Sequence, residues 1–420
     1  MNQNLLTEMY NKGAQAKKAA RKLAVISSEV KDKALVAMAK QLEFQSAKIE
    51  AANELDLIAG REKGLSKALL DRLMLNSKRI TEMADGLRAL ANLDDPVGEV
   101  LSMWKRPNGL QVGRIRVPLG VVGIIYEARP NVTVDAAGLC LKTGNSVILR
   151  GGSEAINSNK IITEIISTAA VEAGMPESAI QLIDTTDREA VNIMLKMNKY
   201  LDVLIPRGGA GLIQAVVENA TVPVIETGIG NCHIYVDTDA DLEMANKIVI
   251  NAKCQRPGVC NAAESLVVHQ DIAADFLPQV AKLLQQQGVE LRGCADTKGI
   301  LPQVKLATEE DFGAEFLDLI ISVKVVGNID EAIEHIHQYG TGHSEAIITE
   351  NYSSAQKFLK LVDAAAVYVN ASTRFTDGFQ FGFGAEIGIS TQKLHARGPM
   401  GLKEMTTTKF IIFGEGQIRS

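Results

Sequence analysis

The stretch "SVILRGGSEAINSNKIITEIISTAAVEAG", residues 146–174, joins a short apolar run to a long helical segment through a pair of glycines. A short run rich in Val, Ile and Leu is typical of a buried strand, and the longer segment is typical of a helix. The same alternation continues, with apolar runs at 179–184, 201–209 and 222–230 and helical segments at 186–197 and 210–220. Buried strands that alternate with helices of roughly 10 to 20 residues predict parallel strands linked by right-handed crossovers.

A second series of apolar runs follows, again separated by helical segments. Its members lie at 231–237, 264–270, 321–327, 344–350 and 365–370. The sequence therefore predicts an α/β protein with two open parallel sheets, one formed within residues 100–230 and the other within residues 231–370.

The flanking segments follow other patterns. Residues 1–95 contain no proline and are rich in Ala, Leu, Lys and Glu, which predicts several helices that end at Pro96 and Gly98. The segment "LQVGRIRVPLGVVGIIYEARP", residues 110–130, is rich in Val and Ile and punctuated by Gly and Pro, which predicts paired strands. Near the end of the chain, a Gly-rich stretch at 381–402 gives way to a predicted strand within 406–416.

Composition excludes several classes of function. The 420 residues carry 44 Lys and Arg against 50 Asp and Glu, a net charge of −6, which gives no electrostatic reason to expect a nucleic-acid partner. No apolar run approaches the length of a membrane-spanning helix, and the first residues do not have the pattern of a secretory signal. The five cysteines are widely spread without a C-x-x-C pair, so we expect reduced thiols in the cytoplasm, no disulfide framework and no metal site.

Glycine-rich turns follow three of the predicted strands, in "LRGGSEA", "PRGGAGL" and "ETGIGNC". Ligands of an open parallel sheet bind beyond the carboxyl ends of its strands, where such turns gather. Glycines let the backbone approach a pyrophosphate, and the charges of Arg150 and Arg207 suit phosphate oxygens. The turns can equally be tight connections without a ligand. Neither G-x-G-x-x-G after a strand nor the phosphate-binding G-x-x-x-x-G-K-[ST] is present.

Two cysteines are candidates for a reactive thiol. Cys260 lies in "QRPGVCNAAES", residues 255–265, after a predicted helix and a break at Pro257-Gly258. A nearby cation such as Arg256 would favour the nucleophilic thiolate. Free cysteines are also commonly small buried hydrophobes, and Cys254 has similar local features, so local sequence does not separate the two.

Glu226 precedes "TGIG" at the end of an apolar run that we interpret as a buried strand. An isolated carboxylate at such a place is costly unless it faces a cleft or forms hydrogen bonds. Glu226 is therefore a candidate general acid or base, and a helix cap or a salt bridge explains it equally well.

Long motifs resemble the aldehyde dehydrogenase superfamily. The segment at residues 118–155 resembles its Gly-Val-Val-Gly and Gly-Asn-x-Val-x-Leu-Lys strands, "ETGIG" its Glu-Leu-Gly-Gly element, and "QRPGVCNAAE" its nucleophile segment. This resemblance implies that Cys260, and not Cys254, is the nucleophile. It also implies an aldehyde dehydrogenase-like fold with a cofactor domain at 1–230, a cysteine-bearing catalytic domain at 231–370, and a return to the cofactor domain at 371–420. A β-extension from the ribbon near 109–125 and the last strand would then serve oligomerisation.

Four further motifs resemble one branch of the superfamily. These are "YEARPNVT", "NAKCQRPGVCNAAE", "YVNASTRFTDG" and "GISTQKLHARGPMGL". The branch implies NADPH-dependent reduction of L-glutamyl 5-phosphate to L-glutamate 5-semialdehyde with release of phosphate. The reaction proceeds through a cysteine thioester and is the second step of proline biosynthesis. The implied partners are this small-molecule substrate, further copies of the chain in a dimer or tetramer, and, through functional coupling, glutamate 5-kinase.

The resemblance assigns roles to single residues. Where the superfamily has an oxyanion-donating Asn, this chain has Arg129, with Asn131 two positions on, and the donor stays open between them. Glu226 is implied as a catalytic residue, although deacylation by hydride requires no hydrolytic base. Arg150 replaces a ribose-binding lysine, which favours NADPH over NADH. The implied cofactor-binding residues are Arg150, Gly151, Ser153, Arg207, Gly208, Gly228 and Glu315. The implied substrate-binding residues are Arg129, Arg256, His395 and Arg397, the last two of which could instead form a structural turn.

Two alternatives to this reading remain. One is another cysteine-dependent reductase or dehydrogenase that acts on an acyl-CoA or a free aldehyde. The other is a nucleotide-binding or scaffolding protein that has kept the fold without the activity.

Overall fold

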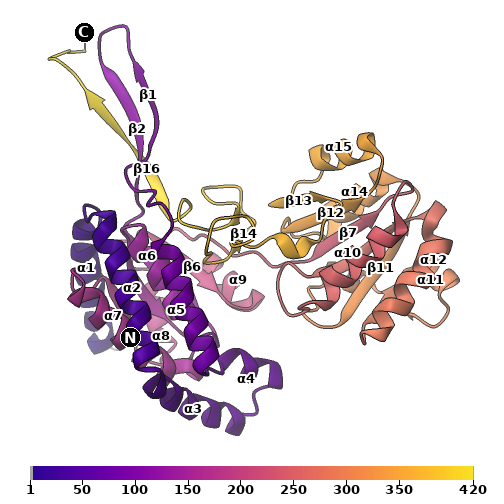
Figure 1. Ribbon diagram of the computed structural model, residues 1–420, viewed down its shortest axis with the longest axis horizontal. Coiled ribbons are helices and arrows are strands. Elements are labelled where there is room, and N and C mark those ends of the chain that lie inside the picture. The colour runs from indigo at the N-terminus through magenta and orange to yellow at the C-terminus, as the bar shows by residue number, and fades with distance from the viewer. Residues whose placement is uncertain (1–2, 420) are drawn as a thin grey trace. The chain divides into compact units, whose positions relative to one another are not determined.

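The computed structural model describes residues 3–419 and divides into two compact units (Figure 1). Unit 1 comprises Met1–Thr227, Gly382–Gly388 and Met400–Ser420, and unit 2 comprises Gly228–Phe381 and Ile389–Pro399. The first division lies close to the predicted boundary at residue 230. The predicted return at residue 371 differs more, because most of the segment 371–399 packs within unit 2.

Unit 1 begins with the predicted N-terminal helices. They are α1 (Gln3–Leu23), α2 (Ser28–Phe44), α3 (Ser46–Glu62), α4 (Lys67–Leu73) and α5 (Ser77–Ala91). Side chains cap two of them, since Ser66 accepts a hydrogen bond from the Leu69 N–H and Asn76 accepts one from the Arg79 N–H. Apolar faces of α1 pack into the same core as the sheet of this unit, which accounts for the helical periodicity of the sequence.

The sheet of unit 1 has four parallel strands in the order β5-β4-β3-β6. The strands are β3 (Val121–Tyr126), β4 (Ser146–Arg150), β5 (Ile180–Leu182) and β6 (Val203–Arg207). The helices that connect or follow them are α6 (Asn131–Lys142), a 3-10 turn η1 (Ser153–Ala155), α7 (Ile156–Glu172), α8 (Glu189–Met194) and α9 (Ala210–Asn219). Strands β3 and β4 are fully buried, as expected for a parallel sheet with covered faces.

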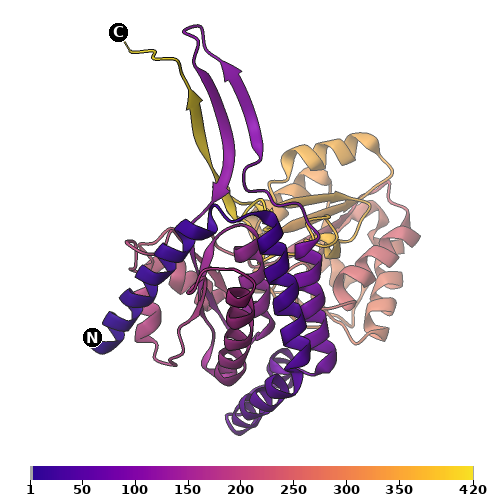
Figure 2. The ribbon, with the colours of Figure 1, turned by 60° about the vertical axis from the view of Figure 1, so that its left-hand side comes forward.

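A three-stranded antiparallel extension projects from unit 1, as both ribbon views show (Figures 1 and 2). It contains β1 (Val100–Lys105), β2 (Gln111–Pro118) and β16 (Thr406–Phe413), in the order β1-β2-β16. The predicted ribbon at 110–130 is thus corrected in one respect. Its first half pairs with β1 and β16, whereas its second half is β3 of the parallel sheet. Gly120, at a φ of 125°, lies between the two halves.

Unit 2 contains seven parallel strands in the order β10-β9-β11-β8-β7-β12-β13. They are β7 (Cys232–Val236), β8 (Ala263–His269), β9 (Glu290–Gly293), β10 (Lys305–Leu306), β11 (Ile320–Val326), β12 (Ser344–Ile348) and β13 (Ala366–Val369). The helices are α10 (Leu242–Cys254), α11 (Gln270–Gln286), α12 (Ala295–Ile300), α13 (Glu309–Gly313), α14 (Ile329–Tyr339), α15 (Tyr352–Leu361) and the 3-10 turn η2 (Thr373–Phe375). A short pair, β14 (Ile389–Ser390) and β15 (Gly398–Pro399), completes the unit.

Alternate residues of the unit 2 strands point into two separate cores. In β7, Ile234 and Val236 join the core formed with α10 and α11, whereas Tyr235 joins the core formed with α14 and α15. Figure 1 shows these two helix pairs on opposite faces of the sheet. The carboxyl ends of the strands remain free for loops that carry function.

Candidate active site

Cys260 lies in a turn that joins the end of α10 to β8. Pro257 and Gly258 stop the helix, and the Ala262 N–H closes the turn by donating to the Val259 carbonyl at 3.0 Å. The Cys260 residue is partly exposed, whereas β8 is buried from its first residue, Ala263. The turn therefore holds this cysteine outside the packed core, where a thiol can meet a substrate.

The Gly-rich segment before β7 holds the Cys260 carbonyl in place. The Cys232 thiol donates to that carbonyl with a sulfur–oxygen distance of 3.2 Å. A Cβ on Gly230 would lie 1.5 Å from the same carbonyl oxygen, so only glycine fits at this position. The Gly230 N–H donates to Glu315 Oε1 at 2.8 Å, which fixes the segment from its other side.

A chain of buried polar groups extends from Cys232 into unit 2. Its sulfur lies 3.7 Å from His343 Nδ1, which lies 2.8 Å from Ser344 Oγ. Ser344 Oγ lies 2.7 Å from Thr376 Oγ1, and Thr376 Oγ1 lies 2.7 Å from the Tyr368 hydroxyl. Burial raises the pKa of the Cys232 thiol well above its usual value, so this thiol stays protonated and acts as a donor.

Arg374 is a site residue that the sequence reasoning missed. The Arg374 Nε donates to Gln255 Oε1 at 2.9 Å, and the amide of Asn261 donates to the carbonyls of Arg374 and Thr376 at 3.4 and 2.9 Å. Arg374 thus contacts both ends of the turn that contains Cys260. Burial lowers its pKa, and the nearby charge of Arg256 lowers it further. Its position in the quoted motif "YVNASTRFTDG" was the available signal.

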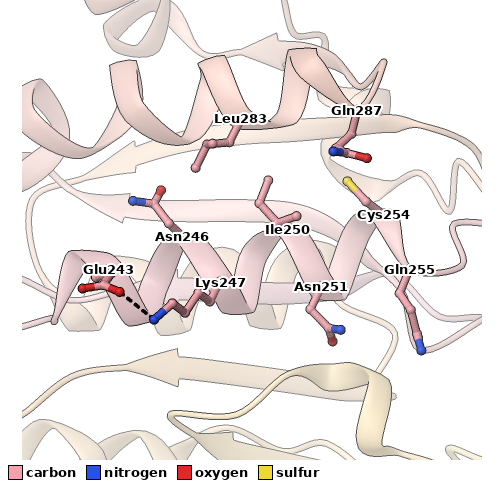
Figure 3. A pocket seen from close by; sticks show the side chains of 9 residues that line it. All are labelled: Glu243, Asn246, Lys247, Ile250, Asn251, Cys254, Gln255, Leu283 and Gln287. Atoms are coloured by element: carbon pink, nitrogen blue, oxygen red, sulfur yellow. Dashed lines mark hydrogen bonds and ion pairs between the residues drawn. The ribbon is translucent and has the colours of Figure 1, made fainter.

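Cys254, the rival candidate, occupies a different environment. It lies in the last turn of α10 and lines a groove of about 680 Å³ between α10 and α11 (Figure 3). The other lining residues include Ile250, Leu283 and Gln287. Burial raises the pKa of the Cys254 thiol, and the charge of Lys253 only partly offsets this. A thiol held in its protonated form is a poor nucleophile.

Lys253 and Glu264 form a buried ion pair beside this turn. Their side chains are fully buried, with Lys253 Nζ 2.6 Å from Glu264 Oε2. They join the last turn of α10 to the start of β8, the two elements that flank the Cys260 turn. Breaking one partner of such a pair would leave an uncompensated buried charge, so the pair fixes the ends of the turn.

In unit 1, Arg150 ends β4 at the carboxyl edge of the sheet. Its residue is 8% exposed, and Nη1 donates to the Gly151 carbonyl at 2.8 Å. Its Nε is a buried donor without a partner among residues 3–419. Burial lowers the pKa of Arg150, and the positive charge of Arg188 contributes to this shift. Arg188 is exposed in the loop after β5 and forms no ion pair in the described part of the chain. Such donors fit a phosphate group.

Two carboxylates, which the sequence reasoning did not consider, lie at the same edge. Glu127 Oε2 accepts a hydrogen bond from the Gly209 N–H at 2.9 Å, at the N-terminus of α9. Glu154 Oε1 accepts one from the Ala128 N–H at 2.6 Å. Gly208 lies against Glu127, so this Arg-Gly-Gly turn holds a carboxylate in the present arrangement.

The two candidate oxyanion donors lie at the start of α6, with Arg129 before the helix and Asn131 as its first residue. Asn131 begins α6, and its amide donates to Asp135 Oδ2 at 3.0 Å. Burial raises the pKa of Asp135 to about 6, while Asn131 and Arg207 oppose this shift. The Arg129 carbonyl accepts the Val132 N–H at 3.0 Å, and its residue is partly exposed. The Asn131 amide is therefore already engaged within its own helix.

The remaining predicted residues lie in several places. Glu226 is partly exposed but does not end a strand, because only an isolated bridge at Val224 precedes it. The segment "ETGIGNC" accordingly leads into β7 and is not a strand-to-helix junction. Gly228 donates its N–H to the Ile389 carbonyl at 2.7 Å. Arg397 Nη2 donates to Asp363 Oδ1 at 2.6 Å.

Ser153, Gly151 and His395 complete the predicted set. Ser153 is exposed at the start of η1, directly after the buried pair Gly151 and Gly152. His395 is exposed and has a φ of 65°, a left-handed conformation suited to a turn.

Within residues 3–419, no helix is both long and apolar enough to cross a membrane.

The structure has two parallel sheets and a cysteine on a turn before a strand, with a glycine packed on the cysteine carbonyl. A comparison with known protein families identifies a family for this chain. The sequence model of the aldehyde dehydrogenase family matches residues 8–293 and 297–411. The chain therefore belongs to the aldehyde dehydrogenase family.

Individual relatives narrow the comparison. The chain is 69% identical to the gamma-glutamyl phosphate reductase of Heliobacterium modesticaldum over 98% of this chain and 99% of that protein. It is 67% identical to the protein of the same name from Moorella thermoacetica, over 99% and 100%. The crystal structure of the Thermotoga maritima gamma-glutamyl phosphate reductase superposes with a TM-score of 0.96 at 54% identity, covering 98% of this chain and 100% of that one. Within its family, the chain therefore groups with the gamma-glutamyl phosphate reductases.

Proposed function

We propose that this chain reduces L-glutamyl 5-phosphate to L-glutamate 5-semialdehyde and releases phosphate, with NADPH as reductant, in the second step of proline biosynthesis. The observation that carries the proposal is the full-length match to enzymes of that name, combined with a partly exposed Cys260 on a turn that Arg374 contacts. The glutamate 5-kinase reaction would supply the acyl phosphate, and we infer that the two enzymes work in the same cytoplasmic compartment.

The proposed chemistry begins at Cys260. Its thiolate attacks the acyl carbon, a carbon–sulfur bond forms, and the bond to the phosphate oxygen breaks. NADPH, when bound, supplies the hydride that converts the thioester into a thiohemiacetal. The sulfur then leaves, the aldehyde is released, and the thiolate is regenerated. Each tetrahedral oxyanion needs fixed donors, which we assign to the Cys260 N–H and to the turn at Arg129 and Asn131.

The charges in unit 1 support the proposal of a phosphorylated nicotinamide cofactor. The buried, unpartnered Arg150 Nε and the exposed Arg188 offer two cations near Ser153, at the edge where open sheets bind nucleotides. We propose that Arg150, Gly151, Ser153, Arg207, Gly208, Gly228 and Glu315 bind NADPH. Glu226 keeps its proposed role as a catalytic residue.

The substrate is tested by running the reaction in the oxidative direction. We expect NADP⁺ reduction with glutamate semialdehyde to require inorganic phosphate, and coenzyme A not to replace it. Phosphate-independent turnover, or turnover that requires coenzyme A, would favour the alternative reductases of free aldehydes or acyl-CoA. A protein that binds nucleotide without any turnover would support the scaffolding alternative.

The oxyanion assignment has its own test. We expect Arg129→Ala to lower kcat, and normal kinetics in that variant would leave Asn131 as the donor. The matched variant Asn131→Ala then decides between the two, because a loss of activity confined to it would assign the role to the amide.

A further inference from the structure

Two guanidinium groups beside Cys260 lack a carboxylate partner. Neither Arg256 nor Arg374 forms an ion pair within the described residues, whereas Arg292 and Arg397 of the same unit are both paired with acidic side chains. Arg256 is exposed and Arg374 is partly exposed, so both can meet a ligand. Two unpaired cations at one place repel each other unless an anion joins them.

Hydrogen bonds hold the segment around Arg374 against the turn that contains Cys260. Thr373 Oγ1 donates to the Asn261 carbonyl at 2.8 Å, and the Asn261 amide returns two bonds to the carbonyls of residues 374 and 376. The side chain reaches across to Gln255, the neighbour of Arg256, through Nε alone. Its Nη1 and Nη2 groups make no hydrogen bond to residues 3–419, so the fork of donors stays available. An arginine fork is suited to a phosphate in particular.

We propose that Arg374 acts with Arg256 as a phosphate site at the Cys260 turn, which binds the phosphoryl group of the substrate and then inorganic phosphate. The inference rests on the proposed function and adds to it the residue that recognises the leaving group. When the Cys260 sulfur bonds to the acyl carbon, the electron pair of the breaking carbon–oxygen bond goes to the phosphate. The two arginines stabilise the charge that gathers there.

The lowered pKa of Arg374 supports this arrangement. Its causes are burial and, next, the charge of Arg256, while the charges of Cys260 and Asp377 oppose them. A bound phosphate dianion would remove the repulsion between the two arginines.

The experiment measures the affinity of the full-length protein for inorganic phosphate, by calorimetry and by the KM for phosphate in semialdehyde oxidation. We expect Arg374→Gln to weaken phosphate binding about tenfold or more, as loss of a charge-assisted fork does. NADP⁺ affinity should change less than about twofold, because that cofactor is assigned to other residues. Arg374→Lys should restore part of the affinity, since it keeps the charge without the fork.

Two control variants separate this role from a structural one. Gln255→Ala removes the side chain that accepts the hydrogen bond from Arg374 Nε and leaves the guanidinium, so phosphate affinity should stay within about twofold of wild type. If Arg374 only ties the turn together, Gln255→Ala and Arg374→Gln should be equally impaired. Lys282→Gln removes one exposed positive charge on α11 and should leave phosphate affinity unchanged.

A measurement on the wild-type protein avoids any dependence on folding of the variants. Inorganic phosphate should slow modification of Arg374 and Arg256 by phenylglyoxal, mapped by mass spectrometry, and should leave Arg292 unaffected. Equal modification of Arg374 with and without saturating phosphate would overturn the inference. If wild type binds no phosphate and turns over without it, the proposed function fails. If wild type binds phosphate and Arg374→Gln binds it equally well, the inference alone fails.

Discussion

Cys232 is a buried residue that contacts the backbone of Cys260, the proposed nucleophile. Its protonated thiol donates to the Cys260 carbonyl, and that carbonyl also meets Gly230 and thereby Glu315. The peptide that follows Cys260 is therefore held from two sides. A hydrogen bond of this kind contributes roughly 0.5 to 1.5 kcal/mol.

We expect Cys232→Ala to lower kcat by about 2- to 10-fold, with little change in KM, because the residue positions Cys260 and touches no substrate. Steady-state kinetics and the rate of Cys260 alkylation would measure this. Cys232→Ser keeps a donor and should retain most of the activity. An alanine variant with unchanged kcat and unchanged alkylation would refute the positioning role.

Cofactor preference also depends on single residues. Arg150 is buried with an unpartnered Nε, and Arg188 adds an exposed charge close enough to lower its pKa. We expect Arg150→Ala and Arg188→Ala each to weaken NADPH binding about tenfold and NADH binding much less, measured by fluorescence titration. Lys160→Ala, on the exposed side of α7, serves as the control. An unchanged ratio of the two affinities would rule out this assignment.

At this scale, the choice of Cys260 as the nucleophile depends on whole motifs and stays a prediction. Cys254 and Cys260 share their local features, and what separates them is that one faces α11 and the other lies on the turn at Arg374. The contact between Arg374 and Gln255 joins residues 119 positions apart, which no local pattern records. Glu127 was missed for the same reason, because its partner Gly209 lies on another strand-to-helix turn.

At the scale of the elements, the β-extension carries several exposed apolar side chains. Phe410, Ile412 and Phe413 of β16 are 60%, 61% and 56% exposed, and Trp104 of β1 packs edge-on to Phe410 at 6.4 Å between ring centroids. Exposed apolar surface and unpaired strand edges are typical of a surface that another chain covers. The predicted homo-oligomer would cover the apolar surface of this extension.

We expect the double variant Phe410→Asp/Ile412→Asp to shift the protein toward the monomer, because both charges would be buried on association. Light scattering coupled to gel filtration measures the mass directly. Lys409→Asp changes the charge of the same strand without changing its apolar surface and serves as the control. A double variant that keeps the wild-type mass would contradict the proposed role of the extension.

Strands could be predicted from the sequence where they coincide with an uninterrupted run of buried apolar residues. Strands β3, β4 and β7 are fully buried and apolar, and they follow the predicted pattern. Strands β1, β9 and β10 were missed because they are short, partly exposed or interrupted by charge, as in "ELRG". Glu226 lacks its predicted strand because the pairing there is limited to one bridge between Leu204 and Val224.

For the whole molecule, the division into two units followed from the two series of strands. The path of the last part of the chain did not, because residues 382–388 and 400–419 pack in unit 1 while 389–399 pack in unit 2. The points at which the chain passes from one unit to the other are decided by tertiary packing. They lie in a Gly-rich segment that has no hydrophobic periodicity from which its structure could be predicted.

Acid stability of the molecule should depend on His335 in the interior of unit 2. Its pKa is lowered to about 3, mainly by burial and in smaller part by the nearby His233 and Lys324. Its Nε2 has no hydrogen-bond partner within the described chain, and its ring packs against Phe312 and Tyr339. An unfolded histidine binds a proton near pH 6.5, so the unfolded state gains protons first as pH falls.

Wild-type stability should therefore fall as pH drops from about 6.5 toward 3, with roughly 2 kcal/mol of the loss at pH 5 due to this residue. His335→Phe keeps an aromatic ring in the same packing and cannot bind a proton. As the pH falls across that range, the unfolding free energy of the variant should therefore rise relative to that of wild type. Urea unfolding at pH 7 and pH 5 measures it. A difference that is the same at both pH values would show that His335 does not titrate in this way.

The central claim is that Cys260 carries the acyl group, and a reaction without phosphate tests it most directly. With glutamate semialdehyde and NADP⁺ but no phosphate, the thiohemiacetal on Cys260 is oxidised to a thioester that has no acceptor. We predict a burst of about one NADPH per chain, an acyl adduct mapped to Cys260 by mass spectrometry, and steady turnover once phosphate is added. Cys260→Ser should give no burst, while Cys254→Ser should behave as wild type. An adduct on Cys254, or a full burst in Cys260→Ser, would contradict the mechanism.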